Sequence, residues 1–213
     1  MTTPYQRNVK EQYEELGRFV EAFELLVRQV RVTCLALTAT DEDHPLQEKL
    51  LQVAFHHQAL TAKPLFEIMR AMIAEIVNLP THRSYSDREF YRDLLGHVQK
   101  QYDHLANTRN NLLHGTWFIG GISFANPESE TFYLQKYTAS KRGLTELPLP
   151  RTAKELRELS ERCGDLLAWL ENIELSLDRV RTVKIKDLFN HQDGVWKLTD
   201  DRARHTSIRS FRP

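Results

Sequence analysis

The segment 109–115 combines residue types that could act on a phosphodiester. It reads RNNLLHG and holds Arg109, two amides and His114 within about one and a half helical turns, followed by a glycine. An arginine stays charged and its planar guanidinium matches phosphate geometry, whereas a histidine can move a proton near neutral pH. A cation for the phosphate beside a base for a hydroxyl is a minimal set of groups for cutting RNA.

The place of Arg109 on its helix strengthens this hypothesis. Apolar residues recur at three- and four-residue steps and predict one buried helix face, at Tyr91, Leu95, Val98, Tyr102, Leu105 and Leu112. The same progression passes through position 109, where an arginine stands. Because burying an unpaired guanidinium is very costly, Arg109 must meet a carboxylate, a subunit interface or a cleft open to a ligand. For a purely structural pair, the candidate carboxylates are Glu67 and Glu75, which lie beside apolar helix faces.

Asn110 and His114 belong to a second, polar stripe on the same helix. They are four residues apart, so they stack on one face and could form a hydrogen bond. Arg109 and His114 instead point about 140° apart and lie about 7.5 Å apart along an ideal helix. Bringing both to one phosphate therefore needs a flexible side chain, a distorted helix end or a second copy of the helix.

The spacing alone is weak evidence, because Arg92 also precedes a histidine, His97, by five positions. Arg92 lies off the apolar stripe, where an arginine is an ordinary solvated residue. Only the segment that begins at Arg109 continues with an asparagine and ends with a glycine after the histidine. The candidate catalytic residues are therefore Arg109, Asn110 and His114.

The sequence RNNLLHG resembles the signature of HEPN domains, in which an arginine and a polar residue precede a histidine on a helix of an all-α bundle. The resemblance spans the seven residues 109–115, and the signature itself consists of Arg109, Asn110, Asn111, Leu112, Leu113 and His114. Many HEPN proteins are metal-independent ribonucleases of toxin–antitoxin, phage-defence or RNA-processing systems, and others bind RNA or proteins without catalysis. They typically dimerise so that two signatures face one cleft.

This resemblance implies a mechanism and a set of partners. His114 would act as general base on a ribose 2′-hydroxyl or as acid to the leaving oxygen, Arg109 would hold the scissile phosphate, and Asn110 would orient His114. We therefore expect a metal-independent endoribonuclease, a toxin or phage-defence component that cuts RNA at a composite site of a homodimer, with an antitoxin or regulatory protein as a further partner. Two alternatives stay open: a non-catalytic HEPN-like module that binds RNA, a nucleotide or a protein, and a structural dimer in which Arg109 pairs with an acid.

Four long helices are expected to position these residues. Apolar periodicity predicts them at about residues 8–37, 45–77, 86–114 and 152–177. Pro45 suits the first position of the second helix, and Pro64 should kink or split it. Capping boxes, in which a hydroxyl residue is followed three positions later by glutamate, begin the third helix at Ser86 and the fourth at Thr152.

Between the third and fourth helices the sequence changes character. Residues 117–124 and 131–137 are rich in aromatic and β-branched side chains and are separated by turn-forming residues, which predicts a β-hairpin at about 117–138. The predicted fold is mostly α, a HEPN-like helical bundle of four long helices with an inserted β-hairpin, in one domain of residues 1–180. Residues 181–213 are predicted to form a basic C-terminal tail, because from Arg179 onward nine Lys/Arg oppose four acids. Such a tail could lie on RNA or dock on a partner.

The overall composition narrows the class of protein. Lys and Arg number 29, as do Asp and Glu, so net charge does not indicate a nucleic-acid partner. The sequence has no apolar run of membrane-spanning length and begins without a signal-peptide pattern, so a cytoplasmic protein without a membrane partner is expected. Cys34 and Cys163 fall in helical patterns without zinc or C-x-x-C spacing and are expected to be reduced packing residues.

Histidine pairs give no metal site. His56 and His57 are adjacent, so they face different directions on a helix. His97 and His104 share a face, but no cysteine or acid completes a set of ligands. We therefore expect no metal and no cofactor.

Overall fold

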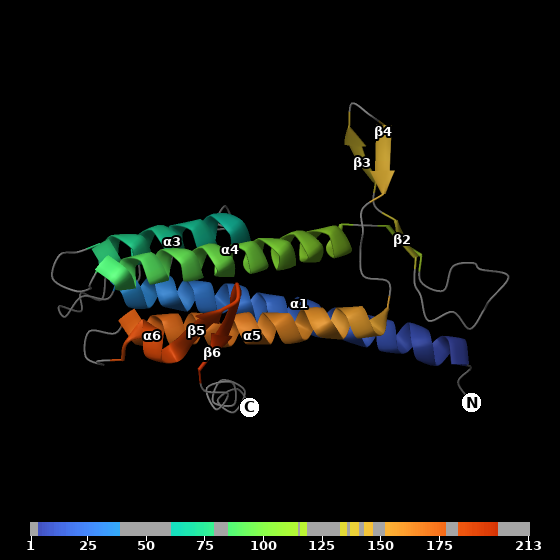
Figure 1. Ribbon diagram of the computed structural model, residues 1–213. Coiled ribbons are helices and arrows are strands. Elements are labelled where there is room, and N and C mark those ends of the chain that lie inside the picture. Colours follow the sequence, from blue (N-terminus) through green and yellow to red (C-terminus); the bar gives the residue numbers. More distant parts are fainter. Residues whose placement is uncertain are drawn as a thin grey trace, which may run out of the picture. The chain divides into compact units, whose positions relative to one another are not determined.

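The computed structural model describes residues 4–38, 61–78, 85–114, 116–118, 133–135, 137–140, 143–146, 152–177 and 183–199. The described chain is mostly helical, as predicted, and four long helices make up most of it (Figure 1). These helices are α1 (Pro4–Thr38), α3 (Ala62–Asn78), α4 (Tyr85–Leu113) and α5 (Ala153–Leu177). Within these ranges, no helix is both long and apolar enough to cross a membrane.

The two capping boxes differ in outcome. At α5 the prediction is confirmed: the Glu155 N–H donates to Thr152 Oγ1, and the Thr152 N–H donates to Glu155 Oε2, both at 3.1 Å. At α4 the prediction that Ser86 precedes the helix is wrong, because the helix already begins at Tyr85 and Ser86 lies in its first turn. The predicted helix itself is confirmed: it was expected to end near His114, and α4 ends at Leu113.

Pro64 begins a helix rather than interrupting one. It is the third residue of α3, in the first turn, where a missing N–H removes no intrahelical hydrogen bond. The upstream part of the predicted second helix, 45–60, lies outside the described residues. The expectation that Pro64 kinks or splits the second helix stays a prediction, and the described part of that helix is α3 from Ala62.

The predicted hairpin after α4 is confirmed in its pairing. β1 (Thr116–Phe118) runs antiparallel to β2 (Tyr133–Gln135), with Trp117 opposite Leu134. A second antiparallel pair follows, β3 (Tyr137–Ser140) with β4 (Gly143–Glu146), which the sequence analysis did not predict. Tyr137 accordingly begins β3 instead of ending the first hairpin.

Regular structure also occurs in the segment that we assigned to a basic tail. A short helix, α6 (Ile185–Leu188), leads into an antiparallel hairpin of β5 (Phe189–Gln192) and β6 (Val195–Leu198). The two-residue turn consists of Asp193 and Gly194, with φ of 52° and 77°. Two successive positive φ values are typical of the type I′ turn, whose twist matches that of the strands. Residues 200–213 lie outside the described part of the chain.

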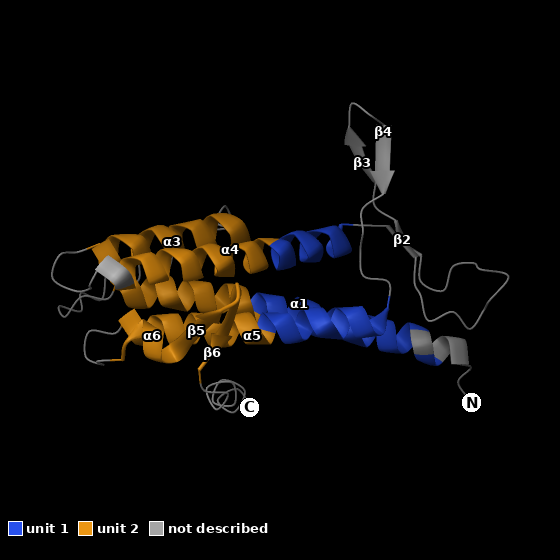
Figure 2. Cartoon of the chain, viewed as in Figure 1, with its two compact units in different colours: residues 1–24, 104–163 blue, residues 25–103, 164–213 orange. Residues whose placement is uncertain are grey.

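The chain divides into two compact units (Figure 2). Unit 1 comprises residues 1–24 and 104–163, and unit 2 comprises residues 25–103 and 164–213. The helices α1, α4 and α5 each contribute one part to either unit. The candidate catalytic residues all belong to unit 1.

Unit 2 is held together by aromatic packing and buried hydrogen bonds. The Tyr102 ring on α4 stacks on Phe66 of α3, with centroids 4.6 Å apart, and Tyr91 Oη lies 2.8 Å from Ser176 Oγ on α5. The C-terminal hairpin packs on the same unit, since Phe189 meets Trp169 edge-on at 5.7 Å. Helices α3, α4 and α5 and the hairpin therefore share one apolar core.

Unit 1 is smaller and contains a buried charge. The Glu15 side chain on α1 is only 3% exposed. Its Oε1 accepts hydrogen bonds from Arg157 Nη2 of α5 at 3.0 Å and from Arg18 Nη1 at 2.7 Å. Removal of a carboxylate from water is unfavourable unless cations and donors compensate it, and here both arginines compensate Oε1, whereas the buried Oε2 has no hydrogen-bond partner among the described residues.

Both cysteines pack in the interior as free thiols. Cys34 lies in unit 2 and Cys163 in unit 1. Burial raises the pKa of each thiol to about 12, because the thiolate is disfavoured away from water. Packing rather than chemistry is therefore their role in the described structure.

Candidate active site

The last turns of α4 carry the three candidate catalytic residues. Leu105 and Leu112 on either side of Arg109 are almost fully buried, as the apolar stripe predicts. The helix ends at Leu113, and the His114 N–H still donates to the Asn110 carbonyl oxygen at 3.0 Å. This backbone hydrogen bond fixes the start of the His114 side chain one turn beyond Asn110.

Arg109 meets a carboxylate within its own chain. Its Nη2 lies 2.6 Å from Glu24 Oε1 on α1, also in unit 1. The Arg109 side chain is 27% exposed and that of Glu24 is 50% exposed, so the pair lies at the edge of the unit. The structural alternative named Glu67 and Glu75, both on α3 in unit 2, as possible partners, whereas the carboxylate that pairs with Arg109 is Glu24.

The remaining nitrogens of Arg109 differ in their environment. Nη1 donates to the Asn110 side-chain oxygen at 3.3 Å. Nε is buried and makes no hydrogen bond with any residue that the structure describes. The Nη1 and Nη2 atoms of the guanidinium are therefore held by Asn110 and Glu24, whereas Nε is a buried donor without an acceptor among the described residues.

Asn110 contacts Arg109 rather than His114 through its side chain. Its link to His114 is the backbone hydrogen bond between neighbouring turns. His114 itself is exposed. Within one chain, the described geometry therefore joins Glu24, Arg109 and Asn110 by side-chain contacts and leaves His114 adjacent on the outer surface.

The second arginine–histidine spacing leads to a different environment. Arg92 is 66% exposed and pairs with Glu89 at 3.6 Å and Asp93 at 3.3 Å. The His97 ring stacks on Trp169, with centroids 5.6 Å apart, and burial, Lys100 and His191 together lower its pKa. This pair consists of a solvated arginine and a packing histidine, as the position of Arg92 off the apolar stripe suggests.

The other histidines form no cluster of metal ligands in the described ranges. Within them, no group of three or more His, Cys, Asp or Glu side chains could hold a metal ion. The His97 ring stacks on Trp169, and His104 is exposed on α4. His56 and His57 lie outside the described residues.

Sequence reasoning missed two charged partners, Glu24 and Glu15. Glu15 could have been found by the argument used for Arg109, because it lies four residues before Phe19 on the apolar face of α1. Glu24 carries a weaker signal, since it is exposed beside that face and its partner lies 85 residues away in the sequence. Local periodicity does not reveal contacts over such a separation.

Comparisons with protein families, curated proteins and solved structures found no match. The resemblance of segment 109–114 to the HEPN signature stays a prediction. What the chain does must therefore be argued from the chemistry of Arg109, Asn110, His114 and Glu24.

Proposed function

We propose that this chain is a metal-independent endoribonuclease of HEPN type that acts as a homodimer. The observation that carries the proposal is the environment of Arg109, a guanidinium with a buried, unsatisfied Nε placed five residues before an exposed histidine. Arg109 is a cation at an apolar position of a packed helix face, and its Nε donor is unused within the described part of the chain. Such a group suits the binding of a phosphate. The adjacent imidazole supplies the proton transfer that RNA cleavage requires.

In the proposed reaction, His114 accepts the proton of a ribose 2′-hydroxyl, and the resulting oxygen attacks the adjacent phosphorus. The bond from phosphorus to the 5′-oxygen breaks, and the protonated His114 returns its proton to that oxygen through water. Arg109 stabilises the negative charge that develops on the phosphate oxygens. The products are a 2′,3′-cyclic phosphate and a 5′-hydroxyl, and no metal takes part.

The contacts of Asn110 and Glu24 support accessory roles for both residues in the proposed site. Asn110 accepts a hydrogen bond from Arg109, so it acts as a positioning residue for the guanidinium. Glu24 occupies the edge of Arg109 that would face a phosphate and must be displaced or share the guanidinium when RNA binds. Replacing Glu24 with glutamine should therefore lower KM for RNA by up to about fivefold, the equivalent of an exposed ion pair.

A composite site also fits the surroundings of His114. Leu113 beside it is 40% exposed, an apolar side chain at the position where a second copy of α4 would pack. A dimer would bring an arginine of one chain towards a histidine of the other, which removes the difficulty that the two point about 140° apart on one helix. The toxin or phage-defence role, and an antitoxin partner, belong to this proposal as its biological setting.

The test is cleavage of total RNA in EDTA by the parent and by the variants Arg109→Ala and His114→Ala. Loss of cleavage in both variants, with 2′,3′-cyclic phosphate ends from the parent, is the expected result. Arg162→Ala and His104→Ala are the matched controls, because both residues are exposed on helices of unit 1 and neither belongs to the site. Absence of cleavage by the parent, or equal cleavage by all variants, would overturn the proposal.

Mixing the two inactive variants tests the composite site. If Arg109 and His114 of different chains act together, random exchange gives half heterodimers with one intact site each, so about a quarter of the parental activity returns. If both residues act from one chain, the mixture stays inactive.

The ion pair between Arg109 and Glu24 favours one alternative, a non-catalytic HEPN-like module in which the same surface binds RNA, a nucleotide or a protein. Because the guanidinium is already paired, its charge is neutralised in the free protein. RNA binding by the parent without cleavage, weakened in Arg109→Ala and unchanged in His114→Ala, would support this alternative.

A further inference from the structure

Unit 2 contains a cavity of about 300 Å³ between α3 and α4, separate from the candidate active site. Its floor is apolar and consists of Ile73, Val77, Tyr91 and Leu95, each at most 3% exposed. The Tyr91 hydroxyl is engaged by Ser176, so the ring presents hydrocarbon to the cavity. The volume lies at the lower end of the range for small-molecule sites, and the floor suits an apolar ligand body.

The rim of this cavity carries more arginines than carboxylates. Arg70, Arg88 and Arg92 line it with a single carboxylate, Glu89, so its formal charge is three minus one, or +2. Arg92 is shared with Glu89 and Asp93 at the surface, and Arg70 donates to Gln99. Two of the three guanidiniums are thus held in place by neighbours and keep other donors for a ligand.

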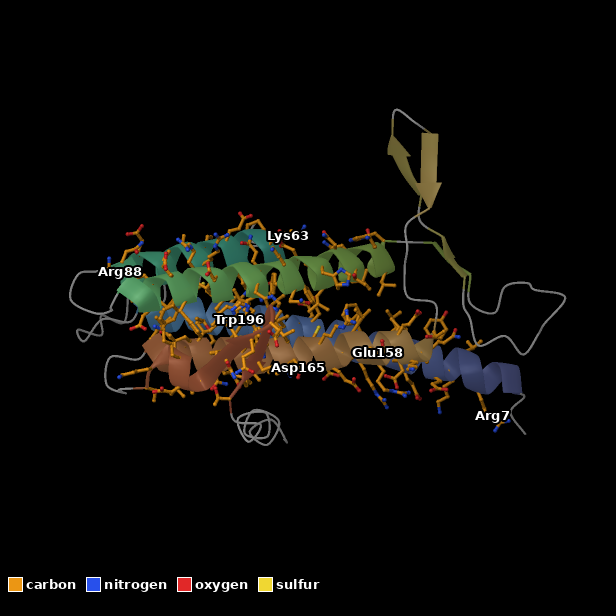
Figure 3. All side chains as sticks on the ribbon, viewed as in Figure 1. Arg7, Lys63, Arg88, Glu158, Asp165 and Trp196 are labelled. Atoms are coloured by element: carbon orange, nitrogen blue, oxygen red, sulfur yellow. The ribbon has the colours of Figure 1, made fainter. Side chains whose placement is uncertain are left out.

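Arg88 is the exception. Its Nε is buried, and no acceptor for it exists among the residues that the structure describes. A buried guanidinium donor without an acceptor is unfavourable unless a ligand supplies one. Figure 3 labels Arg88 near the start of α4, at the end of unit 2 where the cavity lies.

We propose that this arginine cavity, lined by Arg70, Arg88 and Arg92 over the apolar floor, binds a small organic phosphate monoester. The planar fork of arginine matches phosphate oxygens, and a monoester carries nearly two negative charges near neutral pH, which complements the rim. The apolar body of the ligand lies on the floor beneath. This site goes beyond the proposed ribonuclease activity and does not depend on it.

Isothermal titration of the full chain at about pH 7.5 tests the proposal, since a phosphate monoester is then mostly dianionic. The probe is phenyl phosphate, with inorganic phosphate and phenol as its two halves. We expect phenyl phosphate to bind with a dissociation constant of about 1 mM or below, and each half to bind at least about tenfold more weakly. Arg88→Ala should weaken binding about tenfold or more, the loss of one charge-assisted hydrogen bond.

Two further variants keep the test decisive. Ala74→Trp fills the cavity from an exposed lining position and should abolish binding even if Arg88→Ala fails to fold. Arg28→Ala removes an exposed arginine of unit 2 outside the cavity and should leave binding unchanged. Binding that survives Ala74→Trp, or that is equal for phenyl phosphate and either half, would overturn the proposal. So would an RNA oligomer that binds through Arg88 while phenyl phosphate does not, because the arginines would then form a surface for the RNA backbone.

Discussion

Replacing Arg109 with methionine should leave the fold intact or make it more stable. Methionine keeps an unbranched side chain of similar length and a high helix propensity, and it restores the apolar stripe of α4. Loss of the pair with Glu24, a half-exposed carboxylate, costs at most about 1 kcal/mol. Removing the buried, unsatisfied Nε returns about 1–3 kcal/mol. The free energy of unfolding should therefore change by between about 0 and +3 kcal/mol.

Urea unfolding followed by far-ultraviolet circular dichroism measures this change. With an unchanged slope of about 2–3 kcal/mol per molar urea, the midpoint should stay or rise by up to about 1.5 M. Arg162→Met is the control, because Arg162 is exposed in the same unit and its replacement should change stability by less than about 0.5 kcal/mol. A loss of more than about 1 kcal/mol in the Arg109→Met variant alone would show that the chain keeps the guanidinium for stability and not for binding a ligand.

Three further expectations concern the described fold. Gly194→Ala should lower the free energy of unfolding by about 1–2 kcal/mol, because Gly194 has a positive φ. Gly96→Ala should raise it by about 0.5–1 kcal/mol, because Gly96 lies in a helix and an added methyl group meets nothing within 4 Å. Equal shifts in the thermal midpoint of the two variants would contradict this. Cys34 and Cys163, with pKa values raised to about 12, should resist iodoacetamide in the native protein at about pH 8 and react in urea, as mass spectrometry can measure; rapid native labelling would show that they are not buried. Because the pKa of His97 is lower in the folded than in the unfolded chain, acid protonates the unfolded chain more readily. The contribution of His97 to the free energy of unfolding should therefore be fully present above about pH 6.5 and be lost as the pH falls below it. His97→Gln should flatten this slope in urea midpoints, and an unchanged slope would assign the pH dependence to other groups.

The helices could be predicted because their determinants are local. Apolar spacing located α1, α4 and α5 to within a few residues, and the capping box at Thr152 gave the start of α5. The hairpin of β5 and β6 carried a local signal as well, since Asp193 and Gly194 form the dipeptide typical of a two-residue turn. The net positive charge beyond residue 179 led to the prediction of a basic tail despite this turn signal. Net charge depends on exposed side chains and carries no information on the buried Phe189, Trp196 and Leu198, which pack the hairpin.

The candidate site could be predicted only in part. Periodicity required Arg109 to have a polar partner, and the structure provides one. Periodicity could not identify Glu24 as that partner, because nothing in the sequence of α1 distinguishes it from the other exposed glutamates of the helix. The arginine cavity was equally inaccessible, since its rim combines Arg70 of α3 with Arg88 and Arg92 of α4, each an ordinary surface arginine in its own helix.

The stacking of aromatic rings in unit 2 equips the protein with an intrinsic optical reporter. The chain has three tryptophans, and two of them, Trp169 and Trp196, lie against the histidine rings of His97 and His191, with centroids 5.6 and 4.3 Å apart. Indole emission from the unit that holds the arginine cavity should therefore respond to release of the C-terminal hairpin, because Trp196 lies within that hairpin. Ligand binding, acid unfolding and local opening of this unit can be followed by fluorescence without any label.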